Sequence, residues 1–200
     1  MNLVIPRVLN NAYCRGCPVY EGKERERRLR ARDLALKLNE KHVPKTIKVL
    51  FVGESPPKNL MWEEEPYSYF YASGPERPKG LAYYMSQVLF GGVLAKDEFF
   101  KRFEESGYYL IDMVKCPMYG LLSEERRKVA RNCAKYLDEE LHSLKFEMAI
   151  FMGKTTFKLV KGLLKLDFPY RVVPLPFRSV ASFKKELEKV LATLSISPHE

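Results

Sequence analysis

The stretch that decides the fold is Ile47-Lys48-Val49-Leu50-Phe51-Val52-Gly53-Glu54-Ser55-Pro56-Pro57 (residues 47–57), in which an apolar run changes abruptly to turn-forming residues. A short run with β-branched residues and little polar alternation is typical of a parallel strand that is buried on both faces. Ligand sites in such sheets lie beyond the carboxyl ends of the strands. The stretch therefore predicts a buried strand that ends at Gly53 and a following loop with functional residues.

Strand-like runs and helical patterns alternate along the rest of the chain. We expect strands at residues 108–114, 148–152 and 171–175, and helices at about 23–41, 80–90, 97–106, 123–144, 153–164 and 182–194. Such alternation implies a parallel sheet with helices on both faces. The prediction is an α/β protein with a single three-layer α/β/α domain over residues 1–195, a central, mostly parallel four-stranded sheet, and a C-terminal tail at residues 196–200.

Two local features add detail to this outline. Residues 54–80 are rich in proline and aromatic side chains, which predicts a long loop rather than a regular element. Loops of this length inside a compact domain are usually functional. Farther along, Ser123 is expected to cap the helix that follows it.

Basic residues outnumber acidic ones, with a net charge of +9 and a pI near 9.3. This balance favours a polyanionic partner, DNA or another nucleic acid, although a charged fraction of 30% also fits a protein from a heat-loving organism. The predicted helix at 23–41 is amphipathic with a positive exposed face, and its basic residues are Arg25, Arg27, Arg28, Arg30, Arg32 and Lys37. No apolar stretch or signal-like start favours a membrane, so we expect a cytoplasmic monomer.

The cysteine spacing is the most specific pattern in the chain. Cys14 and Cys17 form a C-x2-C pair, and Cys116 and Cys133 follow much later. Because thiols of cytosolic proteins stay reduced, the four cysteines are expected to serve metal binding or catalysis rather than form disulfides. Four thiolates suit either zinc or an iron–sulfur cluster.

Several stretches together resemble the family 4 and family 5 uracil-DNA glycosylases. They are residues 13–18 (Tyr-Cys-Arg-Gly-Cys-Pro), 49–57 (Val-Leu-Phe-Val-Gly-Glu-Ser-Pro-Pro), 113–117 (Met-Val-Lys-Cys-Pro) and 149–154 (Ala-Ile-Phe-Met-Gly-Lys). The resemblance spans about residues 13–178 and implies the uracil-DNA glycosylase fold. It also implies that Cys14, Cys17, Cys116 and Cys133 hold a [4Fe–4S] cluster, with zinc or unrelated buried thiols as the alternatives.

The same resemblance implies a base pocket behind the first strand. Glu54, in the pair Gly53-Glu54, would position or activate the attacking water, and Ser55 would border the substrate. Among three consecutive aromatic residues at 69–71, Phe70 is expected to stack on the base, with Tyr71 beside it. The alternative for Glu54 is that it only anchors a proline-rich loop.

Two positions depart from the family pattern. Asp112 stands where the family has a base-reading Asn, and an ionised Asp only accepts hydrogen bonds, which suits an edge with two donors, as in guanine-type bases, better than uracil. Asp112 could instead cap a helix or pair with Lys115. Leu175 stands where a His is usual, and the alternatives are that Arg178 or Ser179 substitutes for this His or contacts a flanking phosphate. Pro176 and Arg178 are expected to border the substrate.

Three functions remain open from the sequence. The first is a DNA-repair glycosylase that hydrolyses the N-glycosidic bond of uracil or another damaged base. The second is a catalytically silent member that binds nucleic acid. The third, from outside the family, is an iron–sulfur or zinc enzyme that acts on nucleotides or other small anions.

Overall fold

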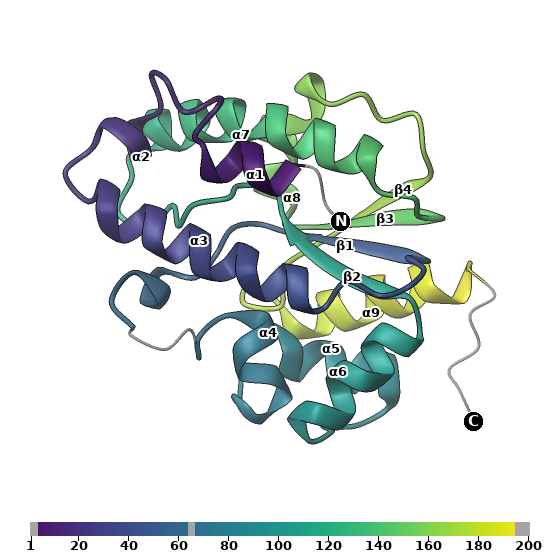
Figure 1. Cartoon of the computed structure of the whole chain (residues 1–200). Coiled ribbons are helices and arrows are strands. Elements are labelled where there is room, and N and C mark those ends of the chain that lie inside the picture. Colours follow the sequence, from purple (N-terminus) through teal and green to yellow (C-terminus); the bar gives the residue numbers. More distant parts are fainter. Residues whose placement is uncertain (1–3, 64–66, 195–200) are drawn as a thin grey trace.

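A computed structural model describes residues 4–63 and 67–194, so the predicted tail at 196–200 lies outside the described residues. Four parallel strands form one sheet in the order β2-β1-β3-β4 (Figure 1). They are β1 (Val49–Gly53), β2 (Tyr108–Asp112), β3 (Met148–Met152) and β4 (Tyr170–Val173). The predicted four-stranded parallel sheet is confirmed, although β2 ends two residues earlier than expected and β4 is shifted toward the N-terminus.

Helices cover both faces of this sheet, which confirms the predicted three layers. Helices α1 and α7 lie on one side, and α5, α6 and α9 lie on the other (Figure 1). The helices are α1 (Val4–Leu9), α2 (Pro18–Glu21), α3 (Arg25–Lys41), α4 (Phe70–Ser73), α5 (Leu81–Phe90), α6 (Lys96–Glu105), α7 (Ser123–Ser143), α8 (Lys154–Val160) and α9 (Val180–Ala192). No helix in the described part of the chain is long and apolar enough to cross a membrane.

The central strands are fully buried because apolar helices pack on both faces. Every residue of β1, β2 and β3 is buried, which accounts for their lack of polar alternation. Register pairs Gly53 with Asp112 and Met152 with Val173, so the carboxyl ends of all four strands meet at one edge. This edge places the loops that follow the strands next to one another.

The loop at residues 54–80 contains more structure than the sequence indicates. It has two short 3-10 turns, Lys58–Met61 and Gly74–Glu76, and the single-turn helix α4 begins at Phe70. The aromatic residues provide the packing for this turn: the Phe70 ring lies 4.9 Å from that of Tyr71 and 5.5 Å from that of Phe103. The expectation of a loop without elements was therefore wrong in part.

The positive face expected for α3 was also wrong in part, because Arg28 and Arg32 are buried. Arg28 donates hydrogen bonds to the carbonyl oxygens of Pro117 at 2.6 Å and Tyr119 at 2.8 Å. Arg30 donates to the carbonyl oxygen of Glu63 at 3.0 Å. Arg28 thus ties a neighbouring loop to α3 from the interior, whereas Arg30 contacts its carbonyl partner from an exposed position.

The start of α7 differs from the expected Ser123 cap. Ser123 is already the first helical residue, and Leu122 is the N-cap residue. The backbone N–H of Leu122 is satisfied by the Glu125 carboxylate at 2.7 Å. In α9 a serine does cap the helix, since Oγ of Ser179 accepts from the backbone N–H of Ser182 at 3.3 Å.

Candidate functional site

A pocket of about 400 Å³ lies beyond the carboxyl ends of β1 and β2. Its walls come from the segment after β1, the α4 region, the segment after β2 and the loop after β4. These segments are far apart in sequence, and the parallel register brings them to one edge of the sheet. The pocket therefore lies where parallel α/β sheets bind their ligands.

The floor of the pocket contains Gly53 and Asp112, which are register partners on β1 and β2. A Cβ atom on Gly53 would lie 2.8 Å from Oδ1 of Asp112. Only glycine leaves room for the Asp112 carboxylate to lie over the end of β1. The Gly-Glu pair in the sequence is thus explained by steric fit at Gly53 as well as by the chemistry of the carboxylate at Glu54.

The Asp112 carboxylate is held by a buried hydroxyl. The single hydroxyl oxygen of Tyr69 lies 2.9 Å from Oδ2 of Asp112 and 2.8 Å from Oδ1 of Asn39. One hydroxyl proton satisfies one acceptor, and a carboxylate is the stronger one. We therefore assign the Tyr69 proton to Asp112 and orient the Asn39 amide with its NH2 group toward the Tyr69 oxygen.

Burial sets the protonation of Asp112. Loss of water raises the pKa of this carboxyl to about 6, although the hydrogen bond from Tyr69 and the charge of Lys115 act in the opposite direction. Lys115 is itself buried, donates to the Asp112 carbonyl oxygen at 2.7 Å and pairs with the buried Glu140. At neutral pH Asp112 is therefore mostly an ionised acceptor.

Glu54 is the second carboxylate in the pocket. It is half-buried and accepts a hydrogen bond from the hydroxyl of Thr156, a buried residue of α8. Leu175 also lines the pocket, and its Cδ1 would lie 3.6 Å from a Cβ added to Gly153. The position that the family resemblance assigns to a His is thus an apolar part of the wall.

The remaining lining includes basic and aromatic side chains that are partly or fully exposed to solvent. Lys58 and Tyr119 interact directly, since the Lys58 ammonium lies 4.6 Å from the centre of the Tyr119 ring. Tyr119 is 51% exposed and Phe177 is 63% exposed. The exposed or half-exposed cations that line the pocket are Lys58, Arg77, Lys79 and Arg126.

The structure brings five of the eight predicted pocket residues together: Gly53, Glu54, Ser55, Phe70 and Asp112 all line the pocket. The other three lie outside its lining. Tyr71 is buried and donates to the Leu110 carbonyl oxygen at 3.3 Å, Pro176 is buried, and Arg178 is exposed.

Sequence reasoning missed several lining residues. Tyr69 was one of three consecutive aromatic residues, and no sequence signal distinguishes the one that reaches Asp112. Tyr119 and Phe177 were detectable as aromatic residues close behind predicted strand ends, next to prolines that favour loops.

A second, small cavity of about 10 Å³ is lined by all four cysteines. Cys14, Cys17, Cys116 and Cys133 are buried and unpaired in disulfides. Burial raises the pKa of the Cys116 thiol well above its usual range, and the neighbouring thiols add to this effect. In the described part of the chain, no group of three or more His, Cys, Asp or Glu side chains has an arrangement that could hold a metal ion.

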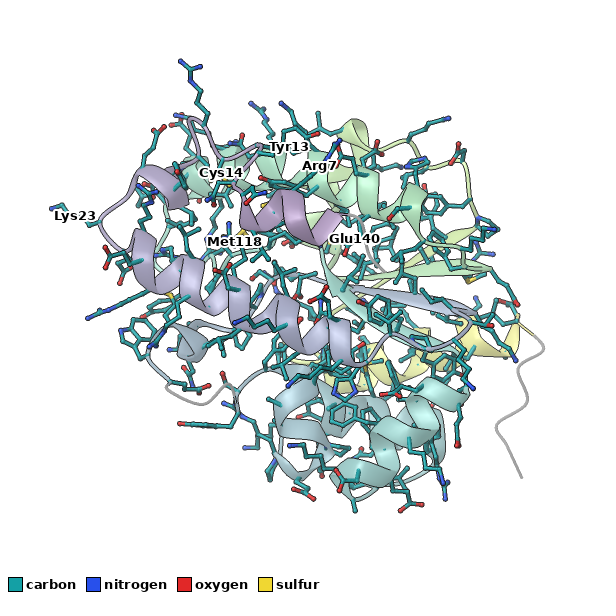
Figure 2. The ribbon with its side chains drawn as sticks, in the orientation of Figure 1. Arg7, Tyr13, Cys14, Lys23, Met118 and Glu140 are labelled. Atoms are coloured by element: carbon teal, nitrogen blue, oxygen red, sulfur yellow. The ribbon has the colours of Figure 1, made fainter. Side chains whose placement is uncertain are left out.

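The N-terminal segment is attached to α7, which carries Cys133. The side chains of Arg7 and Tyr13 point toward each other (Figure 2), and Nη1 of Arg7 donates to the Tyr13 hydroxyl at 3.2 Å. Both side chains also donate a hydrogen bond to the Glu139 carboxylate. The backbone N–H of Tyr13 also donates to the Tyr136 hydroxyl at 2.7 Å. These contacts hold the C-x2-C segment against the helix of the fourth cysteine.

Four thiols line one small cavity, and thiolates are the donor type that iron–sulfur clusters and zinc take, but their side chains are not arranged as a metal site in this structure. Two buried cations also line this cavity, Lys115 and Arg32. Arg32 is 2% exposed and donates to Oδ1 of Asn11 at 2.7 Å. Its charge lowers the pKa of Cys116 against the larger effect of burial.

The fold and pocket define a class: a parallel α/β domain with an acidic pocket floor and basic lining at the carboxyl edge of its sheet. The sequence profile of the Uracil DNA glycosylase superfamily matches residues 40–198. The chain belongs to this superfamily.

A solution NMR structure of a candidate uracil DNA glycosylase from Methanosarcina acetivorans is similar over 76% of this chain and 94% of that chain, with 13% identity and a TM-score of 0.47. No curated protein matches the chain significantly.

Proposed function

We propose that this protein is a DNA glycosylase that removes a damaged or deaminated base by hydrolysing its N-glycosidic bond. The observation that carries the proposal is the pocket at the carboxyl edge of the sheet, which combines two carboxylates, Glu54 and Asp112, with basic and aromatic lining. An enzyme of this kind must take the base out of the duplex and enclose it. Superfamily membership supports the same reaction class.

Glu54 would be the catalytic carboxylate. Water attacks C1′ of the sugar, the bond from C1′ to the base nitrogen breaks, and the base leaves with the bonding electrons. A carboxylate beside this centre accepts the proton of the water and stabilises the positive charge that develops on the sugar. The hydrogen bond from Thr156 holds Glu54 in one orientation for this role.

The cations and aromatic side chains around the pocket would bind the nucleic acid. Lys58, Arg77, Lys79 and Arg126 offer positive charge to phosphates, and such contacts make affinity depend steeply on salt. Tyr119 and Phe177 are exposed enough to stack on bases next to the one that is removed. Phe70 lies deeper and would contact the extracted base itself.

The four cysteines would hold a [4Fe–4S] cluster. Support comes from their common cavity and from the nearby charge of Arg32, which favours a thiolate-bound group. The cluster would supply a cross-link between the N-terminal segment, the segment after β2 and α7. It takes no part in the hydrolysis proposed here.

The experiment that tests the function is a glycosylase assay on duplexes that each contain one modified base. Formation of abasic sites by the wild-type protein, and its loss in Glu54→Gln, would support the proposal. Lack of abasic sites with every duplex, together with retained DNA binding, would contradict it.

One observation favours a second candidate, a catalytically silent DNA-binding member. Leu175 is an apolar wall residue and cannot donate a hydrogen bond to a leaving base. Loss of such a donor typically costs a few kcal/mol of transition-state stabilisation. Retained binding without excision in the same assay would select this candidate.

A further inference from the structure

The pocket floor around Asp112 is rich in hydrogen-bond acceptors. Two carboxylates, Glu54 and Asp112, line it, and Pro56 and Pro57 in the wall have no backbone N–H. The lining also includes the hydroxyl groups of Ser55, Ser68 and Ser73. The cations in the lining are exposed or half-exposed, so they lie toward solvent rather than at the floor. At Asp112 itself, a carbonyl oxygen on the reading edge of a base would meet another acceptor rather than a donor.

The Asp112 carboxylate is held in one orientation, and its oxygens can accept further hydrogen bonds. Its Oδ2 accepts from Tyr69 at 2.9 Å, whereas its Oδ1 accepts no hydrogen bond from the described residues. The absence of a side chain on Gly53 leaves Oδ1 uncovered at the end of β1. Each carboxylate oxygen can accept two hydrogen bonds, so both oxygens remain able to accept from a ligand.

Resting on the proposed function, we infer that Asp112 selects a base whose edge carries two adjacent N–H donors, the ring N–H and exocyclic amino group of a guanine-type base. Both donors would bind the carboxylate, one to each oxygen. Uracil offers one such N–H between two carbonyl oxygens, and these oxygens would be repelled by the carboxylate. Asp112 is therefore a specificity-determining residue, and Tyr69 is the positioning residue that holds its orientation.

A buried polar site discriminates strongly against a ligand that lacks the matching group. A hydrogen bond to an ionised group contributes about 1.5–3 kcal/mol, which corresponds to about tenfold to a hundredfold in affinity. Guanine and hypoxanthine provide a matched pair because they differ only in the 2-amino group. The comparison of these two bases isolates the second donor.

The test uses the full chain and measures binding, so that it does not depend on catalysis. Duplexes with one unpaired guanine, hypoxanthine or uracil are titrated at pH 8, where Asp112 is ionised. We expect the wild type to bind the guanine duplex at least about tenfold more tightly than the hypoxanthine duplex. Asp112→Asn should lose this preference and bind uracil better, whereas the exposed Asp97→Asn should behave as the wild type.

Tyr69→Phe is the positioning control, because it keeps Asp112 but frees its rotamer. It should reduce the guanine preference without creating one for uracil, and circular dichroism would verify that each variant is folded. Equal wild-type affinity for guanine and hypoxanthine would overturn the inference, as would tighter binding of uracil.

Excision of the same three bases is measured in parallel, and it separates the two proposals. Excision of uracil without the guanine preference would overturn this inference and leave the glycosylase proposal intact. The guanine preference without excision of any base would support this inference and contradict the glycosylase proposal.

Discussion

Gly53 and Asp112 are register partners, and the Cβ that Gly53 lacks would lie 2.8 Å from Oδ1 of Asp112. Real Cβ atoms do not approach an oxygen this closely, so any other residue at position 53 would move the carboxylate. The glycine before Glu54 is therefore part of the pocket, since it determines where the Asp112 carboxylate lies.

The first prediction concerns this contact. Gly53→Ala should displace the Asp112 carboxylate and lower the free energy of unfolding by about 1–3 kcal/mol, as overpacking does. Base selectivity should fall with it. Urea denaturation and the duplex titrations measure both effects, and Gly92→Ala is the control because a Cβ there meets no atom within 4 Å. Equal stability of the Gly53→Ala variant and the wild type would contradict the steric argument.

The second prediction concerns the catalytic carboxylate. Glu54→Gln should lower the rate of excision by about 10²–10⁴-fold, the usual contribution of a general base, with little change in DNA affinity. Single-turnover kinetics and fluorescence anisotropy measure the two quantities. Glu188→Gln, on the exposed side of α9, is the matched control. An equal loss of binding in Glu54→Gln would assign Glu54 to loop anchoring instead.

The third prediction concerns the pH dependence of stability. Asp112 faces Tyr69, Lys115, Glu140 and Glu54, and burial raises its pKa from 3.8 to about 6. Between these two values the folded protein keeps a proton that the unfolded chain releases, so the contribution of Asp112 to stability falls as pH rises. At neutral pH the ionised Asp112 lowers the free energy of unfolding by up to about 3 kcal/mol.

Asp112→Asn should remove this penalty. Urea denaturation at about pH 4.5 and pH 7.5 should show the variant gaining stability relative to the wild type at the higher pH. If the free energies of unfolding of the two proteins differed by the same amount at both pH values, Asp112 would not titrate in this range.

The fourth prediction separates the two kinds of arginine on α3. Arg28→Met leaves two carbonyl oxygens and the exposed Glu24 carboxylate without their partner, so it should lower the free energy of unfolding by about 1–3 kcal/mol. Arg27→Met, at the exposed neighbouring position, should leave stability almost unchanged. Thermal and urea denaturation compare the two variants, and similar stabilities would contradict the tethering role.

The fifth prediction concerns the cysteines. Protein purified without oxygen should contain iron and acid-labile sulfide in equal amounts and absorb broadly in the visible range. Cys133→Ser should lower both contents and the thermal stability, whereas Arg131→Ser, at an exposed position of the same helix, should change none of them. A colourless protein that contains zinc would contradict the cluster and indicate a zinc site at the four cysteines.

The strands were predictable because burial on both faces leaves a short, nearly continuous apolar run, as in Phe51-Val52 of β1. The burial of Arg28 was not, since its partner carbonyls lie 89 and 91 residues farther along the chain. Local sequence shows a basic helix, and only the tertiary fold determines which of its side chains point inward. The same holds for Tyr69, whose partner Asp112 is 43 residues away.

The hydrogen bond from Thr156 to Glu54 joins residues 102 positions apart, and β1 pairs with β3 across a similar distance. Such long loops must close before their contacts can form, which makes folding slow. During synthesis on the ribosome, Glu54 leaves the exit tunnel long before α8 exists. A truncated or nascent chain therefore cannot assemble this pocket, and it exposes an unpaired edge of β1 until the last third of the protein has been made.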